Sequence, residues 1–257
     1  MAEKKAYRVP AVTRTLDILE YLSKNEEASL TQIHQDLNLA KSTSYGILLT
    51  LEDRGYIRKG ISGKYQLGLK LYELGVKARE RIDYVKEAYP ILKELAEKTG
   101  LTCNFGVLDG DVAVYLEKID APSPIRLNSW KGKRMPLHCT ALGKALLAFQ
   151  NLPETIEILE RLELTKLTNR TITDKDTLLS QLLKIKKDGY AIDDQENEID
   201  ITCIAVPVFD QTNKVVGAIS LSGLASRMTP EKIQETIVYL KLACNSISEK
   251  IGVKLPK

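Results

Sequence analysis

Residues 29–67, SLTQIHQDLNLAKSTSYGILLTLEDRGYIRKGISGKYQL, predict two short helices joined by a tight turn and followed by a hairpin. Ser29 and Gln32 have the spacing of a capping box, so a helix is expected to begin there. Asn38 tolerates the left-handed conformation that ends a helix, and a second helix is expected from about Ala40. Two short helices joined by so tight a turn are typical of a helix-turn-helix unit.

The second of these helices begins with small polar side chains at Ser42 and Thr43, next to Lys41 and Tyr45. Hydroxyl and ammonium groups can bond to base edges and phosphates, and a helix start without bulky side chains can enter the major groove. Polar residues also begin many ordinary helices. The sequence of this helix alone therefore leaves DNA binding open.

The hairpin after the helix favours DNA binding, because its tip combines glycines with basic residues. Ile57, Tyr65 and Leu67 are predicted to point inward, away from that tip. Such a hairpin is a wing, and its natural target is the phosphate backbone. The predicted DNA contacts of this winged helix-turn-helix are Arg14, Lys41, Ser42, Thr43, Tyr45, Arg58, Lys59 and Lys64.

Amphipathic helices are predicted on both sides of this module. Residues 11–24 place four apolar side chains at helical spacing, Val12, Leu16, Leu19 and Leu22. Residues 68–82 do the same with Leu71, Leu74, Ala78 and Ile82. A solvated linker helix is one interpretation of the second stripe, but an apolar stripe needs a partner, so we expect it to pair with a second copy of itself. A two-fold dimer would present two reading helices to a palindromic site.

Charge is unevenly distributed along the chain. The net charge is +3 over 257 residues, yet residues 1–81 hold 14 lysines and arginines against 10 aspartates and glutamates. A basic first third and a near-neutral remainder fit a module that faces a polyanion, joined to a larger part with another task. The length suggests two domains, and 44% hydrophobic residues exclude wholesale disorder.

Composition also bears on location and chemistry. No apolar run approaches the roughly 20 residues that span a bilayer, and the first residues lack the apolar segment of a signal peptide. The four cysteines form no CxxC pair, which is typical of neither a zinc ribbon nor a disulfide framework and fits a reducing compartment. His34 and His138 are the only histidines. We therefore expect a cytoplasmic protein that is not an enzyme and has no cofactor.

The remaining chain predicts an α+β domain rich in antiparallel strands. A helix after residue 83 contains Pro90, which is easiest to tolerate if the helix proper begins near Glu87. Asp109 and Gly110 suit a hairpin turn between two β-rich runs. Further strands are predicted at 124–130, 202–209 and 214–221, and further helices from about 140, at 153–162, at 174–188 and at 230–251.

Two segments of this second part resemble the IclR family of bacterial transcriptional regulators. Residues 189–210, GYAIDDQENEIDITCIAVPVFD, match the family signature at Gly189, Asp193, Glu196, Cys203, Ala205, Val208, Phe209 and Asp210. Residues 138–148, HCTALGKALLA, are a second hallmark, and the winged helix-turn-helix is a third. The resemblance covers essentially the whole chain and is greatest to regulators of sugar-acid catabolism of the 2-keto-3-deoxygluconate type. At Gly46, where family members often carry a basic residue, the chain departs from the pattern.

The resemblance implies three parts: a winged helix-turn-helix domain over 1–67, a linker and dimerisation helix over 68–83, and an effector-binding domain over 84–257 with a GAF-like mixed sheet and flanking helices. It further implies a homodimer or homotetramer that binds a double-stranded DNA operator and a small organic acid. We expect repression of a carbon-catabolism operon, because a bound dimer obstructs polymerase. An activator of the same class and a ligand-independent architectural protein are the alternatives.

The resemblance also implies where the effector binds. Ser220 and Ser222 are two residues apart, so on a strand they share one face and aim both hydroxyls into one cavity. Together with a helix N-terminus they would hold a carboxylate, while Asp193 accepts a hydrogen bond from an effector hydroxyl. Leu127 and Met135 would supply apolar walls. The implied effector-binding residues are Leu127, Met135, Thr140, Ala141, Asp193, Cys203, Ser220 and Ser222.

The histidines and cysteines of this domain offer weak candidates for a catalytic or metal site. His138 and Cys139 are neighbours, and adjacent residues on a strand point to opposite faces, so they cannot form a catalytic pair there. Cys203, His138 and Asp193 could be imagined around a metal, but unpaired cysteines are usually small core residues. We therefore expect no catalytic and no metal-binding residue.

Overall fold

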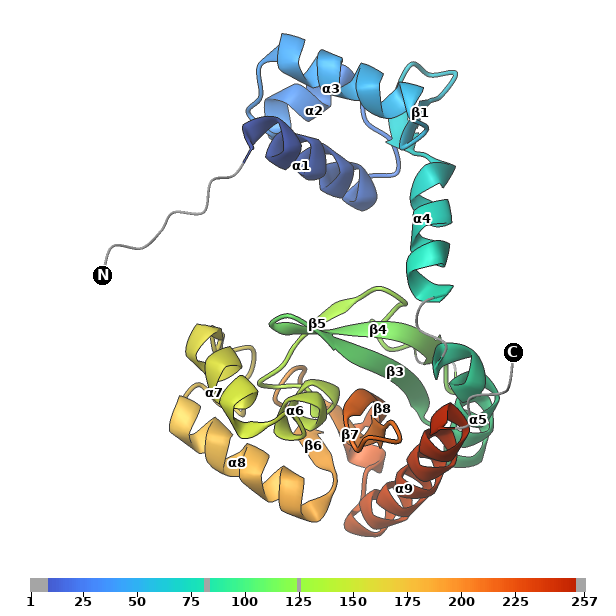
Figure 1. Ribbon diagram of the computed structural model, residues 1–257, viewed down its shortest axis with the longest axis vertical. Coiled ribbons are helices and arrows are strands. Elements are labelled where there is room, and N and C mark those ends of the chain that lie inside the picture. The colour runs from blue at the N-terminus through green and yellow to red at the C-terminus, as the bar shows by residue number, and fades with distance from the viewer. Residues whose placement is uncertain (1–8, 81–83, 124–125, 253–257) are drawn as a thin grey trace. The chain divides into compact units, whose positions relative to one another are not determined.

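The computed structural model describes residues 9–80, 84–123 and 126–252. The chain divides into two compact units, Met1–Ile82 and Asp83–Lys257 (Figure 1). Within the described ranges, no helix has both the length and the apolar character needed to cross a membrane.

The first unit consists of three helices, a two-stranded hairpin and a further helix. Its elements are α1 (Pro10–Lys24), α2 (Leu30–Asp36), α3 (Lys41–Asp53), β1 (Ile57–Lys59), β2 (Tyr65–Leu67) and α4 (Leu69–Glu80). Ser29 and Gln32 form the predicted capping box at the start of α2. Asn38 adopts the expected left-handed conformation with a φ of 49°. The winged helix-turn-helix prediction is confirmed.

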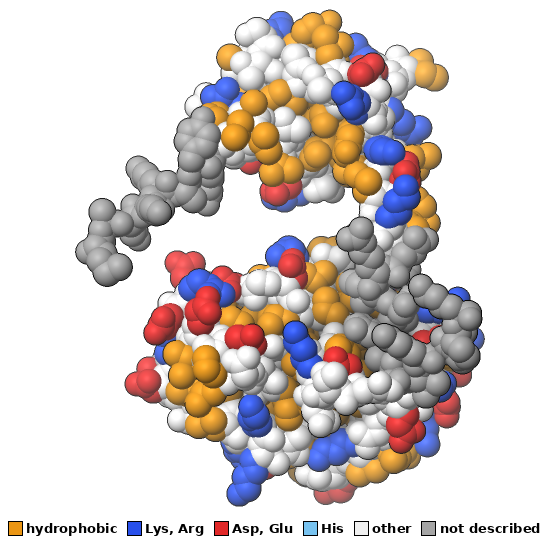
Figure 2. Space-filling view, viewed as in Figure 1, with side chains coloured by type: hydrophobic (Ala, Val, Ile, Leu, Met, Phe, Trp, Pro, Cys, Tyr) orange, Lys and Arg blue, Asp and Glu red, His pale blue; other side chains and the backbone are white. Residues whose placement is uncertain are grey.

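One face of each of the helices α1, α2 and α3, together with the hairpin, forms the core of the first unit. Its buried residues are Ile18, Leu22, Ala28, Ile33, Leu48, Leu51, Ile57 and Tyr65. The prediction for α1 was wrong at Val12 and Leu16, which are exposed, and Figure 2 shows hydrophobic surface on this unit. Residues two apart on a helix point about 200° apart, so a helix that buries Ile18 turns Leu16 outward. Leu67, also predicted to point inward, is exposed at the end of β2.

Helix α4 keeps apolar side chains on its surface. Leu69, Tyr72 and Leu74 are exposed, and on the same helix Lys70 and Lys77 both pair with Glu73. Of the predicted linker stripe, Leu71 is half-buried and Leu74 is exposed, whereas Ile82 and the side chain of Ala78 lie outside the described residues. The exposed apolar residues are consistent with a helix that is covered in an assembly.

The second unit is an α+β domain built on a six-stranded sheet. Its elements are α5 (Tyr84–Thr99), β3 (Thr102–Asp109), β4 (Val112–Ile119), β5 (Arg134–Pro136), α6 (Ala141–Ala148), α7 (Leu152–Arg161), α8 (Lys175–Asp188), β6 (Ala191–Asp194), β7 (Ile201–Phe209), β8 (Val215–Leu224), a 3₁₀ turn (Ala225–Arg227) and α9 (Pro230–Gly252). The strand order is β5-β4-β3-β8-β7-β6. Every pairing is antiparallel, as the sequence pattern predicted and in place of the mixed sheet that the resemblance implied.

Helices cover both faces of this sheet (Figure 1). Ala191, Ala205 and Ala218 face the core that α6, α7 and α8 complete. The opposite face packs against α5 and α9, where the Cys244 thiol of α9 donates to the carbonyl of Val206 at 3.5 Å. Small residues beneath α6 let a fully buried helix lie close to the sheet.

One local prediction in this unit, the strand at 124–130, was wrong. Of residues 124–130, predicted as a strand, 126–130 are a loop, and the nearby strand begins at Arg134. Lys118 explains the loop, because its ammonium binds the carbonyls of Leu127 and Ser129 at 3.2 and 2.8 Å, and those carbonyls are then used by a side chain. Helix α5 begins at Tyr84, so Pro90 lies inside it. Pro90 is on the exposed side, where water can bond the carbonyl that the proline leaves free.

Candidate functional site

The start of α3 presents the predicted reading residues to solvent. Lys41, Ser42 and Tyr45 are exposed and Thr43 is half-buried. Ala40, at the N-cap, provides no side-chain bond to the first turn. The first backbone N–H groups of α3 are therefore not capped by that residue and can bind a phosphate.

The wing lysines lie in different environments. Lys59 is exposed, with its ammonium 5.3 Å from the centre of the Tyr65 ring. Lys64 lies 2.8 Å from Glu27, and this ion pair lowers the pKa of the Glu27 carboxyl. Lys64 would have to leave Glu27 before it could bind another anion, whereas Lys59 has no carboxylate partner among the described ion pairs. Ile61, which was given no role from the sequence, is fully exposed at the wing tip. The remaining predicted basic contacts, Arg14 and Arg58, are exposed.

Four side chains form a line across the sheet of the second unit. Asp193 on β6 is opposite Cys203 on β7, which is opposite Ser222 on β8, and Ser222 is opposite Thr102 on β3. Directly opposite residues share a face, and this face is the one that α6 covers. We call these four residues the polar row. Asp193, Ser222 and Thr102 are buried, whereas Cys203 as a residue is partly exposed.

Ser220 lies on the same face, two residues along β8. It is opposite Ala205 on β7 and Asn104 on β3. The structure thus brings Asp193, Cys203, Ser220 and Ser222 together, although they lie on three separate strands. Tyr115 of β4 also belongs to this region, because burial and the nearby groups of Cys203 and Asp193 raise the pKa of its hydroxyl.

Asp193 is the carboxyl group of the polar row, and its surroundings change its pKa. One of its carboxylate oxygens accepts backbone N–H bonds from Glu196 at 2.7 Å and Asn197 at 3.3 Å. Burial nevertheless raises the pKa of Asp193 to about 7, because these two bonds offset only part of the desolvation. The side chain can therefore change its charge near neutral pH.

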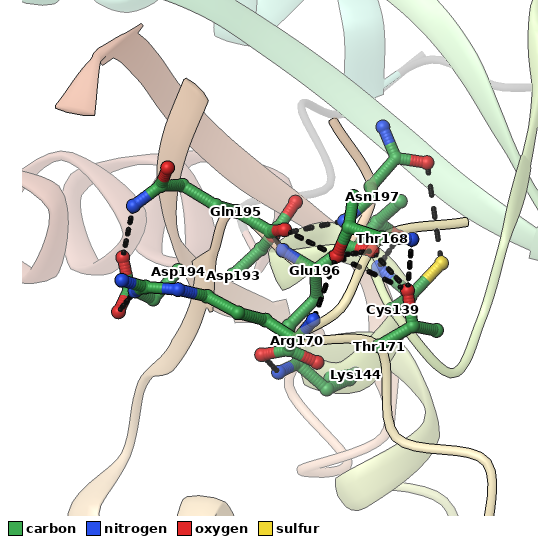
Figure 3. A network of polar contacts seen from close by, with 12 residues as sticks. Cys139, Lys144, Thr168, Arg170, Thr171, Asp193, Asp194, Gln195, Glu196 and Asn197 are labelled. Atoms are coloured by element: carbon green, nitrogen blue, oxygen red, sulfur yellow. Dashed lines mark hydrogen bonds and ion pairs between the residues drawn. The ribbon is translucent and has the colours of Figure 1, made fainter. Parts of the chain in front are cut away.

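A buried ion pair holds the segment that makes these bonds (Figure 3). Lys144, on α6, is 0% exposed and pairs with Glu196, which is also buried. The hydroxyls of Thr168 and Thr171 donate to the carbonyls of Gln195 and Glu196, at 2.7 and 2.6 Å. Burial raises the pKa of Glu196, and Lys144 opposes that rise. Lys144 thus ties the loop after β6 to the helix that covers the polar row.

The Thr140 hydroxyl forms two hydrogen bonds at the start of α6. The hydroxyl oxygen accepts from the Gly143 N–H at 3.0 Å and so caps α6, while the O–H donates to the Pro136 carbonyl at 2.6 Å. A Cβ at Gly143 would lie 2.6 Å from the Leu137 Cα, so only glycine permits this close approach. Ala141 follows as the first residue of α6 and is buried. Both residues serve the packing of α6 in this structure.

Leu127 and Met135, the predicted apolar walls, lie in the loop before β5 and on β5 itself. Leu127 is half-buried in the loop before β5. Met135, on the edge strand β5, lines a cavity of about 370 Å³ together with Arg134, His138 and Arg161. A second cavity in the described part of this unit, of about 470 Å³, lies beside β6 and the start of α9. Neither of these two cavities is lined by Asp193, Cys203, Ser220 or Ser222.

Sequence reasoning missed Asn104, Thr102, Tyr115 and Lys144. A weak signal existed for two of them, since Thr102 and Asn104 are polar at alternate positions of an otherwise apolar strand. Among the described residues, no three His, Cys, Asp or Glu side chains gather closely enough to hold a metal ion. His138 lies 3.0 Å from the Thr165 carbonyl, whereas the Cys139 thiol points to Asn197. The two neighbours thus have different partners.

Comparison with known protein families gives two matches along the chain. Residues 11–60 match the IclR helix-turn-helix domain. Residues 76–249 match the C-terminal domain of the bacterial transcriptional regulator IclR. The first match covers α1 to β1, and the second covers the polar row.

Individual relatives are similar over nearly their whole length. The HTH-type transcriptional regulator KdgR of Escherichia coli is 38% identical over 97% of this chain and 95% of its own. XynR, an HTH-type transcriptional regulator of the same organism, is 36% identical over 95% of this chain and 98% of its own. The crystal structure of Thermotoga maritima IclR aligns with a TM-score of 0.80 at 34% identity, covering 94% of this chain and 98% of that one. These families and relatives are transcriptional regulators, not enzymes.

Proposed function

Because the chain belongs to the IclR family of bacterial transcriptional regulators, we propose that a small organic acid bound by its second unit changes the affinity of its first unit for operator DNA. The observation that carries this proposal is the polar row. Buried acid and hydroxyl groups there lie on the same sheet face as a partly exposed cysteine. Hydrophobic side chains would pack against α6 at less cost, so the row is suited to a polar ligand.

DNA binding in this proposal uses the exposed start of α3 and the wing. Ser42, Thr43 and Tyr45 contact bases, while Lys41 and the first N–H groups of α3 contact phosphate. The wing adds Lys59 and the other basic residues beside it. Direct contacts of this kind fix both the register and the sequence preference of a reading helix.

Effector binding in this proposal uses the polar row together with Ser220. The hydroxyls of Ser220 and Ser222 bind the acid, and Asp193 accepts a bond from an effector hydroxyl. Cys203 provides the partly exposed point of entry. Since the relatives include KdgR, we favour a sugar acid of the 2-keto-3-deoxygluconate type.

In this proposal, three consecutive parts of the chain have separate functions. Residues 1–67 bind DNA, 68–83 connect and dimerise, and 84–257 bind the effector. The exposed apolar residues of α4 support dimerisation, because a second copy would cover them. Repression follows when a dimer on its operator obstructs polymerase. A coupling free energy of about 1–3 kcal/mol between the two sites would change operator affinity roughly 5- to 150-fold.

A thermal-shift screen of the full chain with 2-keto acids and sugar acids tests effector binding. A ligand that binds only the folded protein adds about 2.7 kcal/mol of stability at 100 times its dissociation constant. We therefore expect an upward shift of several degrees for at least one sugar acid. A ligand-independent DNA-binding protein would show no shift with any acid of the panel.

The wing makes its own prediction about salt. Exchange of Lys59 for alanine should weaken operator binding and lower the slope of log affinity against log salt by about 0.9, the value for one lost phosphate contact. Exchange of Lys64 should have a smaller effect on affinity, because Lys64 first has to leave Glu27. Fluorescence anisotropy between low and moderate salt measures both slopes. An unchanged slope in both variants would place the wing away from the DNA backbone.

A further inference from the structure

Gly46 lies in the middle of α3, where the packing of the first unit does not require a glycine. It is exposed, and a Cβ added there would have no atom of the described residues within 4 Å apart from its chain neighbours and its own helix backbone. By contrast, Gly55 and Gly63 have positive φ angles of 74° and 76°, and a Cβ at Gly68 would collide with the backbone carbonyl of Gly55. Glycine inside a helix costs stability relative to alanine. A partner outside the chain that approaches α3 closely would explain Gly46.

Leu49 lies one turn further along the same side of α3, because residues three apart on a helix are neighbours. It is 45% exposed, whereas Ile47 and Leu48 pack in the core of the first unit. Ser42, four residues before Gly46, is also exposed. We call the position at Gly46, where no side chain stands between Ser42 and Leu49, the glycine gap. The gap is thus bordered by a hydroxyl on one side and by a large apolar side chain on the other.

The exposed side of α3 changes in character along the helix. Its first part presents the hydroxyls of Ser42 and Tyr45 to solvent. Further along, the Thr50 hydroxyl donates to the Gly46 carbonyl at 2.9 Å, so it is already used within the helix. Leu49 offers only hydrocarbon. The part of α3 around the glycine gap is therefore suited to an apolar group more than to a hydrogen-bonding one.

Thymine carries the apolar group that base pairs present in the major groove, its 5-methyl group. From Ser42 to Leu49 the helix rises about 10 Å, which corresponds to about three base steps of DNA. When Ser42 contacts one base edge, Leu49 can therefore reach a base a few steps away. The gap is continuous with the exposed Lys41 and Tyr45. An ammonium and a hydroxyl beside an apolar contact suit DNA, which combines phosphates, base edges and methyl groups.

We propose that Leu49 and the glycine gap bind the methyl group of a thymine in the major groove and so help to select the operator sequence. The inference rests on the proposed DNA binding by α3 and deepens it, because it specifies one base and the two residues that read it. Gly46 leaves room for the methyl group, and Leu49 packs against it. A side chain at residue 46 would fill that room.

Deoxyuridine tests the inference, because it differs from thymidine only by the missing methyl group. The probe is a duplex that the full chain selects from a random pool, with each thymine exchanged in turn, and fluorescence anisotropy measures the affinities. At one thymine or more, the exchange should weaken binding of the wild type about fourfold, the factor expected for one buried methyl group. Leu49→Ala should bind the two duplexes within about twofold of each other, because the partner of the methyl group is gone.

Gly46→Ala should reverse the preference for thymine. Its added methyl group occupies the gap, so it should bind the thymine duplex about tenfold more weakly than the wild type does. Deoxyuridine at the same position makes room again and should restore part of the affinity. The melting temperature of this variant should rise, because alanine is the better helix former. A lowered melting temperature would show that the glycine serves the fold and would overturn its proposed role.

Leu16→Ala is the matched control, because Leu16 is also an exposed leucine, on α1. It should keep the wild-type ratio of the two affinities. A wild type that is indifferent to every exchanged methyl group, or a preference that Leu49→Ala retains, would overturn the thymine contact and leave DNA binding by α3 intact. A full chain that selects no duplex from the pool would overturn the proposed DNA binding and the inference with it.

Discussion

Exchange of Lys144 for methionine should lower the free energy of unfolding by about 3–5 kcal/mol, because it leaves the buried Glu196 carboxylate without its cation. The second oxygen of Glu196 already has no hydrogen-bond partner among the described residues. The remaining charge would therefore have little compensation. Denaturant unfolding at pH 8 measures the loss.

The pH dependence of this variant identifies the cause. Burial raises the pKa of Glu196, and the loss of Lys144 removes a group that lowers it. The carboxyl then takes up a proton more readily in the folded than in the unfolded state, so the variant should be less destabilised at pH 5 than at pH 8. If Lys144→Met lost the same free energy of unfolding at both pH values, the cause would be lost packing and not an unpaired charge.

Two further variants serve as controls. Lys144→Met combined with Glu196→Gln should recover much of the lost stability, since no unpaired charge remains. Lys70→Met breaks the exposed pair with Glu73 and should lower stability far less than Lys144→Met does, because water screens the two charges. If the double variant were as unstable as Lys144→Met alone, the loss of stability in Lys144→Met would not come from an unpaired charge.

Exchange of Asp193 for asparagine should change how stability depends on pH. The folded-state pKa of Asp193 is about 7, well above its unfolded value. The folded protein binds the Asp193 proton more tightly than the unfolded chain does. This difference contributes fully to the free energy of unfolding below about pH 4, and the contribution is lost as the pH rises through 7. Between pH 5 and pH 8, the free energy of unfolding of the wild type should therefore fall by about 2–3 kcal/mol more than that of the variant. Urea unfolding at both pH values measures the difference.

Asparagine suits this test because its carbonyl can still accept the N–H bonds of Glu196 and Asn197. Asp194→Asn is the matched control, because Asp194 is the next residue, is exposed and pairs with Arg170. The control should keep the pH dependence of the wild type. Parallel curves for wild type and Asp193→Asn would show that Asp193 titrates as it does in the unfolded chain.

Local signals in the sequence were sufficient for much of the first unit. The capping box at Ser29 and the left-handed residue Asn38 each depend on a few neighbouring residues, and both were predicted correctly. The apolar stripe of α1 was predicted incorrectly. Leu16 and Ile18 are both apolar, and only the packed structure determines which of them is buried. In the second unit, the strand expected at 124–130 failed since a distant lysine, Lys118, binds its carbonyls.

The candidate site could be predicted only in part for a similar reason. Family resemblance pointed to Asp193, Cys203 and Ser222, but strand register, which is not readable from one sequence, places them in one row. Asn104 enters the same face through the pairing of β3 with β8. Lys144 and Glu196 are 52 residues apart, and no periodicity links them. Contacts between distant segments thus determine the chemistry that local patterns leave open.

The central claim is that an acid bound at the polar row changes the affinity of the first unit for operator DNA. The most direct measurement is the operator affinity of the wild type and of the double variant Ser220→Ala/Ser222→Ala, each with and without 2-keto-3-deoxygluconate. The account predicts equal affinity of both proteins for the operator without the acid, and a change of at least fivefold on adding it to the wild type only. A double variant that responds as the wild type does would contradict the account.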